Sequence, residues 1–366
     1  MKIGTLHLFE NPTGRTEHEC VREQLNMMCA AEDLGFDHIW PAEHHFTEYG
    51  YLASPQVSLA YIAAKTKRLK LAQGVIVLPF HNPIRVAEDL AMLDLMSDGR
   101  VIAGLGRGYQ PGEFKGFRID QETSRELFDE QIRLVAQCWN DDRVNFDGKY
   151  YQVEDLVVRP KPLQQPHPPI YMAVLSPETW EIAGRYGFNV LTSCAFGMSE
   201  EDAISGVARY RKARAEAGMN PEHGSVAMLF QVYAAPTMEE ALGEYGPAVT
   251  WYYRTIAKYV APKGAAVKSY EGYKDAQKLA QTVEFDQLLD TAGMVVGTPE
   301  VVTEKVTRLA NAIGFDEFLC WVRIGGMPEN KVVRAMDLIA SKVMPEVRKN
   351  LASREQREPA VVSAVG

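Results

Sequence analysis

Residues 1–41, MKIGTLHLFENPTGRTEHECVREQLNMMCAAEDLGFDHIWP, contain one strand, one helix and a second strand. Residues 1–8 are mostly apolar and predict the first strand, and residues 38–41 predict the second. Between them, apolar residues recur at helical spacing over 16–34, and Gly35 ends that helix. Two strands joined through one helix run parallel and are connected by a right-handed crossover.

The same alternation of strand and helix continues through most of the chain. Further strands are predicted at 71–78, 101–105, 170–174, 190–192, 225–234 and 318–324. Helices are predicted at 54–67, 84–96, 122–139, 177–186, 200–217, from 239 onward, 299–313 and 331–347. A Gly/Pro-rich loop is predicted between the strand that ends at 105 and the helix that starts at 122. Eight strand-helix units predict an α/β fold of the (β/α)8 TIM-barrel type, because eight parallel strands close into a barrel. An open, doubly wound sheet is the structural alternative.

Two stretches interrupt the alternation and are expected as insertions in a single barrel domain over 1–348. Residues 144–169 contain two extended pieces around Asp147-Gly148, which predict a hairpin, and then a proline-rich link. Residues 260–292 are polar, contain glycine and show little periodicity. The end of the chain, 349–366, is small and polar and is expected to be disordered.

The composition excludes several classes of partner. The formal net charge is −9 with the two signs well mixed, which disfavours nucleic acid and anionic membranes. No stretch approaches the roughly 20 apolar residues of a membrane span, and the N-terminus lacks the features of a secretory signal. The 5 cysteines are scattered without a Cys-x-x-Cys pair, so reduced thiols are expected rather than disulfides or a zinc site. These features predict a cytoplasmic protein.

Barrel enzymes carry their chemistry at the C-terminal ends of the strands. This rule selects the candidate positions 43–45, 79–82, 106–109, 175–179, 193–196, Gln231 and Arg323. His44 and His45 are adjacent, and neighbouring side chains of an extended segment point in opposite directions, so at most one faces the barrel mouth. That spacing argues against a metal site. A neutral imidazole acting as acid, base or hydrogen-bond donor is the functional interpretation, and a structural histidine is the alternative.

A candidate anion site lies at the ends of the fourth and fifth strands. The segment 104–108, Gly-Leu-Gly-Arg-Gly, places a positive charge in a flexible loop, although its spacing does not match the dinucleotide fingerprint. After the fifth strand, Ser176 and Pro177 mark a helix N-terminus, whose free N–H groups suit a phosphate. Arg107, Ser176 and Thr179 would form a phosphate site if they converge. A paired surface arginine and an ordinary helix cap are the alternative.

Several uncommon segments occur in one order over nearly the whole chain. They include 43–50 (EHHFTEYG), 76–79 (IVLP), 81–85 (HNPIR), 93–100 (LDLMSDGR), 296–299 (VGTP) and 343–345 (VMP). With these segments the chain resembles the bacterial luciferase-like family of flavin-dependent monooxygenases, and in particular the alpha chain of bacterial luciferase. The resemblance spans residues 1 to about 348 and implies a barrel that binds FMN.

The resemblance also implies which residues bind the cofactor. The positions that match those holding the flavin phosphate are Arg107, Arg125, Ser176 and Thr179. Gly74 and Val75 match a pair joined by a cis peptide beneath the flavin ring. Gly106 and Leu175 are the remaining cofactor-binding positions. No metal ligand is implied.

Other residues are implied in catalysis and assembly. His44 matches a histidine needed for activity, and it is the expected catalytic residue. His45 and Glu88 match a hydrogen-bonded pair across the dimer interface, so a homodimer is expected. The unpatterned stretch 260–292 matches a mobile loop that closes over the site.

The chain departs from the luciferase alpha chain around the pocket. That alpha chain has a reactive cysteine at the position of Gly106, a glutamate at Leu175, and tryptophans around Thr192 and Cys194. Light emission and a long-chain aldehyde substrate therefore do not follow from the resemblance. Smaller residues at these positions suggest room for a bulkier substrate.

The resemblance implies a monooxygenase that uses reduced FMN and molecular oxygen. Reduced FMN would add oxygen to form a flavin hydroperoxide, which would oxygenate a small organic substrate in a water-poor pocket. Because no nicotinamide fingerprint is present, reduced flavin is expected from a separate NAD(P)H:flavin reductase. The alternatives are a non-catalytic flavin-binding partner subunit, a deazaflavin-dependent dehydrogenase of the same superfamily, and last a metal-dependent barrel hydrolase.

Overall fold

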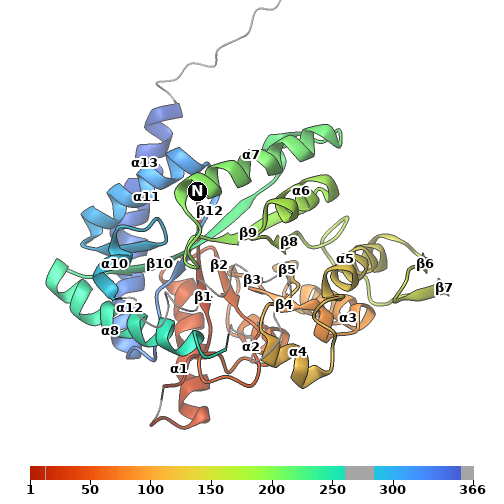
Figure 1. Cartoon of the computed structure of the whole chain (residues 1–366), viewed down its shortest axis with the longest axis horizontal. Helices are drawn as coiled ribbons and strands as arrows, with labels where there is room; N and C mark the ends of the chain where they lie inside the picture. The colour runs from red at the N-terminus through yellow and green to blue at the C-terminus, as the bar shows by residue number, and fades with distance from the viewer. Residues whose placement is uncertain (13, 260–283, 356–366) are drawn as a thin grey trace, which may run out of the picture.

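The computed structural model describes residues 1–12, 14–259 and 284–355, and its centre is a closed barrel of eight parallel strands (Figure 1). In barrel order these strands are β1 Lys2–His7, β2 His38–Pro41, β3 Lys70–Ala72, β5 Val101–Gly106, β8 Ile170–Ala173, β9 Asn189–Ser193, β10 Val226–Ala234 and β12 Glu317–Trp321. β12 pairs with β1 and closes the ring. The predicted (β/α)8 barrel is confirmed, and the open doubly wound sheet is wrong.

Helices surround the barrel and connect its strands (Figure 1). They are α1 Glu17–Asp33, α2 Pro55–Ala63, α3 Pro83–Met96, α4 Pro111–Phe117, α5 Ser124–Asn140, α6 Pro177–Tyr186, α7 Glu200–Glu216, α8 Met238–Ile256, α10 Phe285–Leu289, α11 Pro299–Ile313, α12 Glu329–Leu338 and α13 Met344–Glu355. Local sequence signals start several of them: Thr16 and Glu19 form a capping box before α1, and Asn82 caps α3. No helix among the described residues is both long and apolar enough to cross a bilayer.

Several elements differ from the sequence prediction. The third strand is broken: β3 ends at Ala72, and only the two residues of β4, Ile76–Val77, resume pairing before a 3-10 helix at Leu78–Phe80. The helix α4 lies where a Gly/Pro-rich loop was expected. An additional strand, β11 Met294–Gly297, pairs with the second half of β10.

The predicted final helix is interrupted as well. One turn of π-helix, Ile339–Val343, separates α12 from α13. Pro345 explains the irregularity, because it has no N–H to donate to the carbonyl four residues earlier. α13 runs to Glu355, beyond the boundary at 349 that composition predicts, and 356–366 lie outside the described residues.

The predicted hairpin is confirmed as β6 Val144–Asp147 and β7 Gln152–Leu156, which pair antiparallel beside α5 (Figure 1). The buried carboxylate of Glu130 on α5 accepts hydrogen bonds from the backbone N–H groups of residues 149, 150 and 151 and so anchors the turn. Of the second predicted insertion, residues 260–283 lie outside the described residues, and the remainder contains the short helix α10.

A buried polar network closes the N-terminal end of the barrel. The carboxylate of Glu317, at the start of β12, accepts hydrogen bonds from the hydroxyls of Tyr171 and Ser225. Its other oxygen lies 2.9 Å from Nε2 of His38. Burial raises the pKa of Glu317, but its contacts with His38, Tyr171 and Lys2 lower it more, to about 2. This network lies at the end of the barrel opposite the strand ends where chemistry is expected.

Candidate functional site

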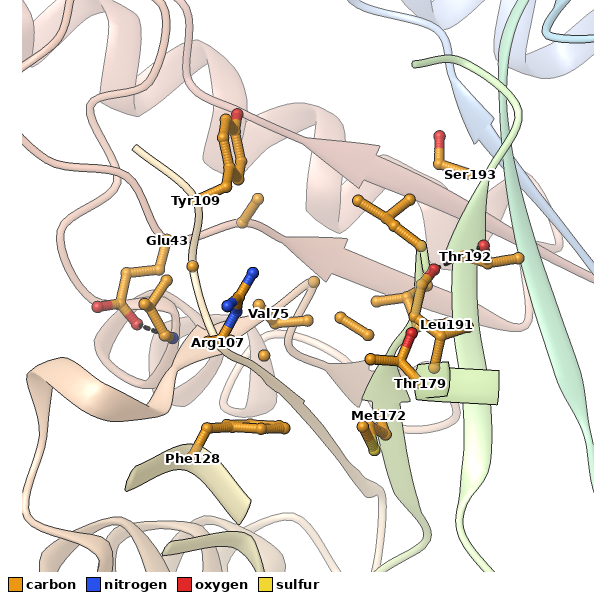
Figure 2. A pocket seen from close by; sticks show the side chains of 18 of the residues that line it. Glu43, Val75, Arg107, Tyr109, Phe128, Met172, Thr179, Leu191, Thr192 and Ser193 are labelled. Carbon is orange, nitrogen blue, oxygen red and sulfur yellow. Dashed lines mark hydrogen bonds between the residues drawn. The ribbon is translucent and has the colours of Figure 1, made fainter. Parts of the chain in front are cut away.

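A cavity of about 380 Å³ opens at the C-terminal ends of the strands (Figure 2). Most of its wall is apolar, with contributions from Leu6, Leu8, Val77, Phe128, Ile132, Met172, Val174, Leu191, Leu229 and Leu319. The predicted cofactor-binding and catalytic residues all line it: His44, Gly74, Val75, Gly106, Arg107, Arg125, Leu175, Ser176 and Thr179. The fold thus brings together nine residues that are spread from position 44 to position 179 of the sequence.

One end of the cavity contains the start of α6. Ser176 is the N-cap in extended conformation and Pro177 is the first helical residue, as predicted. The hydroxyl of Thr179 donates to the carbonyl of Ser176 at 2.7 Å, and the two hydroxyl oxygens are 3.4 Å apart. A helix start with two hydroxyls and partial positive charge suits an anion.

Two arginines line the same cavity. Arg107 follows β5, and Figure 2 shows its side chain between Glu43 on one side and Thr179 on the other. β5 and β8 are paired neighbours, so residues after these two strands reach the same part of the barrel mouth. Arg125, near the start of α5, places Nη1 3.5 Å from Oε2 of Glu178. Arg107, Ser176 and Thr179 therefore all line one cavity.

Glu178 is an acidic group that the sequence analysis did not single out. Its Oε2 accepts a hydrogen bond from the hydroxyl of Ser176 at 3.0 Å as well as the contact from Arg125. The hydrogen bond from Ser176 and the charge of Arg125 lower the pKa of Glu178 against a small effect of burial. An acid in the first turn of a helix is so common that the sequence alone offers no reason to assign it a role.

His44 faces the cavity and His45 does not, as their adjacency predicts. Nδ1 of His44 lies 3.0 Å from Oε1 of Glu113, in the first turn of α4, and 2.9 Å from the amide nitrogen of Gln110. Glu113 is buried and its Oε1 also accepts the backbone N–H of His45 at 2.9 Å. Glu113 was missed because its segment was expected to be a loop; Pro111 at the first helical position was the available signal.

Two tyrosines lie behind this histidine. The hydroxyls of Tyr49 and Tyr109 are 3.0 Å apart, and the side-chain amide of Gln110 donates to Tyr49. Burial, with smaller effects of neighbouring Tyr109 and Glu113, raises the pKa of Tyr49 well above its ordinary value. The phenol of Tyr49 is therefore a neutral hydrogen-bonding group at neutral pH.

The cavity floor is formed where the third strand breaks. The peptide bond between Gly74 and Val75 is cis, as the resemblance implies. A Cβ atom at Gly106 would lie 2.5 Å from Cγ2 of Val75 and 3.3 Å from Cβ of Ala173. The space beside Gly106 is therefore already occupied by Val75, so this glycine does not enlarge the pocket as we expected.

Two further positions, Thr192 and Cys194, were expected to leave more room in the pocket, but only one of them lines it. Thr192 lines the cavity, and its hydroxyl donates to the carbonyl of Val174 at 2.8 Å. Cys194 is 2% exposed, lies outside the cavity lining and places its thiol 3.5 Å from the sulfur of Met228. Of these two, only Thr192 shapes the wall.

The residues expected at a dimer interface contact other partners within the single chain. Nε2 of His45 lies 2.9 Å from Oε1 of Glu43. Glu88, on α3, accepts a hydrogen bond from Arg85 at 2.6 Å.

The residues present suit FMN. Arginines and a helix start at one end suit a phosphate, glycines and Val75 line the floor, and apolar walls suit a flat ring system. Within the part of the chain that the structure describes, no group of three His, Cys, Asp or Glu side chains is arranged to hold a metal ion.

Comparison with known proteins identifies the family of this chain. Residues 1–317 match the family model of luciferase-like monooxygenases. The chain is 26% identical to an alkanal monooxygenase alpha chain from the Kryptophanaron alfredi symbiont, over 95% of this chain and 99% of the relative. It is 25% identical to the oxygenase component of a flavin-dependent trigonelline monooxygenase from Acinetobacter baylyi, over 98% of both chains.

Solved structures share the same fold. The monooxygenase RslO1 from Streptomyces bottropensis superimposes with a TM-score of 0.81 at 29% identity, covering 94% of this chain and 99% of that one. An F420-dependent secondary alcohol dehydrogenase shares the fold at 21% identity with a TM-score of 0.75, covering 95% and 99%. The family match covers most of the chain and the site residues lie in one cavity. The chain belongs to the luciferase-like monooxygenase family.

Proposed function

We propose that this chain is the oxygenase of a two-component system that uses reduced FMN and molecular oxygen to oxygenate a small organic substrate. The observation that carries the proposal is the convergence of Arg107 with Ser176 and Thr179 at one end of an apolar cavity that also contains His44. Bound reduced FMN would supply the electrons that activate oxygen. A separate NAD(P)H:flavin reductase would supply the reduced flavin, as the name of the trigonelline oxygenase component suggests for that relative.

The protein's own side chains would bind and orient the flavin and exchange a proton with the substrate. Arg107, Arg125 and the start of α6 would hold the phosphate, and Val75 would support the ring from below. The apolar wall would exclude water from the reacting atoms. His44, with Nδ1 directed to Glu113, would exchange a proton with substrate through Nε2.

The cavity wall indicates the class of substrate. Its hydroxyls are engaged internally: Thr192 donates to a backbone carbonyl, and Ser193 accepts the N–H of Ala195. Beyond the two arginines of the phosphate end, the described wall is dominated by aliphatic and aromatic side chains. We therefore propose an uncharged, largely apolar substrate.

The decisive experiment compares ligands that differ only in the phosphate. FMN and riboflavin are titrated, in oxidised and reduced form, against the wild type and Arg107→Ala. FMN should bind the wild type more tightly than riboflavin, and Arg107→Ala should remove most of that preference. Oxygen uptake with an added flavin reductase and a panel of apolar substrates then tests the activity of the isolated chain, which a non-catalytic partner subunit would lack.

A deazaflavin-dependent dehydrogenase is the second candidate function, because an F420-dependent relative shares the fold. Titration with F420 under the same conditions separates the two. Binding of F420 without binding of FMN would replace the proposal.

We also propose a homodimer that acts in the cytoplasm. Exposed apolar side chains on α2 (Val57, Tyr61) and α3 (Met92, Leu95, Met96) provide a surface suited to a second copy. Glu88, Met92 and Met96 are four residues apart and share one face of α3. All 5 cysteines are unpaired, which suits a reducing compartment.

A further inference from the structure

Glu43 is a buried acid between the cavity and the outer face of the barrel mouth. It follows β2, is 2% exposed and lines the cavity (Figure 2). Isolated buried carboxylates are costly, so the partners of this one determine what it can do. Each of its two oxygens contacts a different part of the molecule.

The inner contacts hold the cavity floor. Oε2 of Glu43 accepts the backbone N–H of Val77 at 2.9 Å, and the backbone N–H of Glu43 donates to the carbonyl of Val75 at 3.3 Å. Val75 and Val77 both line the cavity. Among the residues that the structure describes, the floor segment 75–77 otherwise pairs only through the two residues of β4. Glu43 therefore clamps both ends of a segment that has little other support from the sheet.

The outer contacts hold the carboxylate. Oε1 accepts from Nε2 of His45 at 2.9 Å and from Nε2 of His81 at 2.8 Å. Burial lowers the pKa of His81, but the hydrogen bond and charge of Glu43 raise it more. Burial raises the pKa of Glu43, but its bonds to His45, His81 and Val77 lower it more. The carboxylate is thus ionised and has donors on both sides.

We propose that Glu43 is a positioning residue that sets the height of the floor segment 75–77 beneath the flavin ring, with its carboxylate held in place by His45 and His81. The inference rests on the proposed function, because it takes the ring to lie on Val75. A glutamine at 43 is a poor replacement for the carboxylate. Its single acceptor oxygen can serve Val77, but its NH₂ group would then face the Nε2 atoms of His45 and His81, and both rings would have to change tautomer to accept.

The experiment compares Glu43→Gln with a matched control at the other end of the barrel. Glu317→Gln makes the same chemical change in another buried carboxylate. Like Glu43, Glu317 contacts a histidine, and it also accepts from a tyrosine, but it does not line the cavity. Both variants should lose thermal stability. Glu43→Gln should in addition bind FMN about tenfold more weakly and shift the absorption spectrum of the bound flavin. Glu317→Gln should keep the wild-type affinity and spectrum.

A second pair of variants, at His81, tests the inference if Glu43→Gln fails to fold. His81 is partly exposed, so His81→Gln and His81→Leu are tolerable changes. The glutamine keeps an N–H donor toward Glu43 and should preserve the flavin spectrum, whereas the leucine should shift it. Wild-type affinity and spectrum in Glu43→Gln, or equal spectra in the two His81 variants, would overturn the inference. A wild type that binds no FMN would instead refute the proposed function.

Discussion

Nδ1 of His44 lies 3.0 Å from the carboxylate oxygen Oε1 of Glu113, and this contact selects one tautomer of the imidazole. A carboxylate oxygen that already accepts the N–H of His45 can only accept again, so Nδ1 is the donor toward Glu113. The side-chain nitrogen of Gln110 also lies 2.9 Å from Nδ1, but its two N–H groups have acceptors in Tyr49 and Glu113. Nε2 makes no hydrogen bond within the described residues and is left for proton exchange at the cavity. Glu113 therefore orients the expected catalytic histidine from 69 residues away.

Substitution of these two residues should separate proton transfer from orientation. His44→Ala should lower turnover at least about tenfold, the low end of general acid–base effects. Glu113→Gln keeps an acceptor oxygen near Nδ1 and leaves the imidazole itself in place, so it should lower turnover less than His44→Ala does. Oxygen uptake and product formation, measured as kcat and KM, check both. Unchanged turnover in His44→Ala would remove the histidine from the mechanism.

Glu178 should weaken binding of the flavin phosphate. Its carboxylate contacts Ser176 and Arg125, two groups that we assign to the phosphate. Glu178→Gln should tighten FMN binding by roughly three- to tenfold at low salt, and less at high salt, because exposed charges are screened. Fluorescence titration measures the affinity. Riboflavin is the control ligand, and an equal gain for riboflavin would contradict a phosphate effect.

Gly106 and Val75 should be energetically coupled. A methyl group at 106 would lie 2.5 Å from Cγ2 of Val75, so Gly106→Ala should displace the floor and weaken FMN binding. Val75→Ala removes the clashing methyls and should restore binding in the double variant. A double-mutant cycle on FMN affinity should give a coupling of about 1 kcal/mol. Additive effects would show that the two side chains do not compete for this space.

Glu317 should make the fold sensitive to acid. Its pKa in the folded protein is about 2, below the ordinary value of 4.5, so the folded state favours the ionised form. The resulting stability, roughly 3 kcal/mol, is present above pH 4.5 and is lost as the pH falls toward 2. Glu317→Gln should lower the free energy of unfolding at pH 7 by about 3 kcal/mol and make it depend less on pH between 4.5 and 2. Denaturant unfolding between pH 2 and pH 7 measures both effects. An unchanged pH dependence in the variant would show that Glu317 is not the group responsible.

The α2–α3 surface should mediate self-association. Met92 is 46% exposed on α3, and a charge there should disrupt an apolar interface. Met92→Glu should shift the protein from dimer to monomer in light scattering after size exclusion. Val301→Glu is the matched control, because Val301 is similarly exposed on α11. A monomeric wild type, or a dimer unaffected by Met92→Glu, would contradict the proposed interface.

Local signals explain which parts of the fold could be predicted. Strands such as β8 and helices such as α6 follow from apolar periodicity and from caps such as Ser176, which act within a few residues. β11 was missed because four apolar residues after an unpatterned stretch carry too little periodicity. The break in the third strand was missed because an unbroken apolar run predicts one continuous strand.

The sequence by itself determined the barrel, the strand ends that form its mouth and, through the family resemblance, the residues that line the cavity. Only the tertiary structure decided their partners: Glu113 beside His44, Glu178 beside Ser176 and Arg125, and Val75 in the space beside Gly106. The physical reason is the distance along the chain over which each kind of interaction acts. Periodicity and capping act over a few residues, whereas these contacts depend on the side-chain directions that result when distant strands pack together.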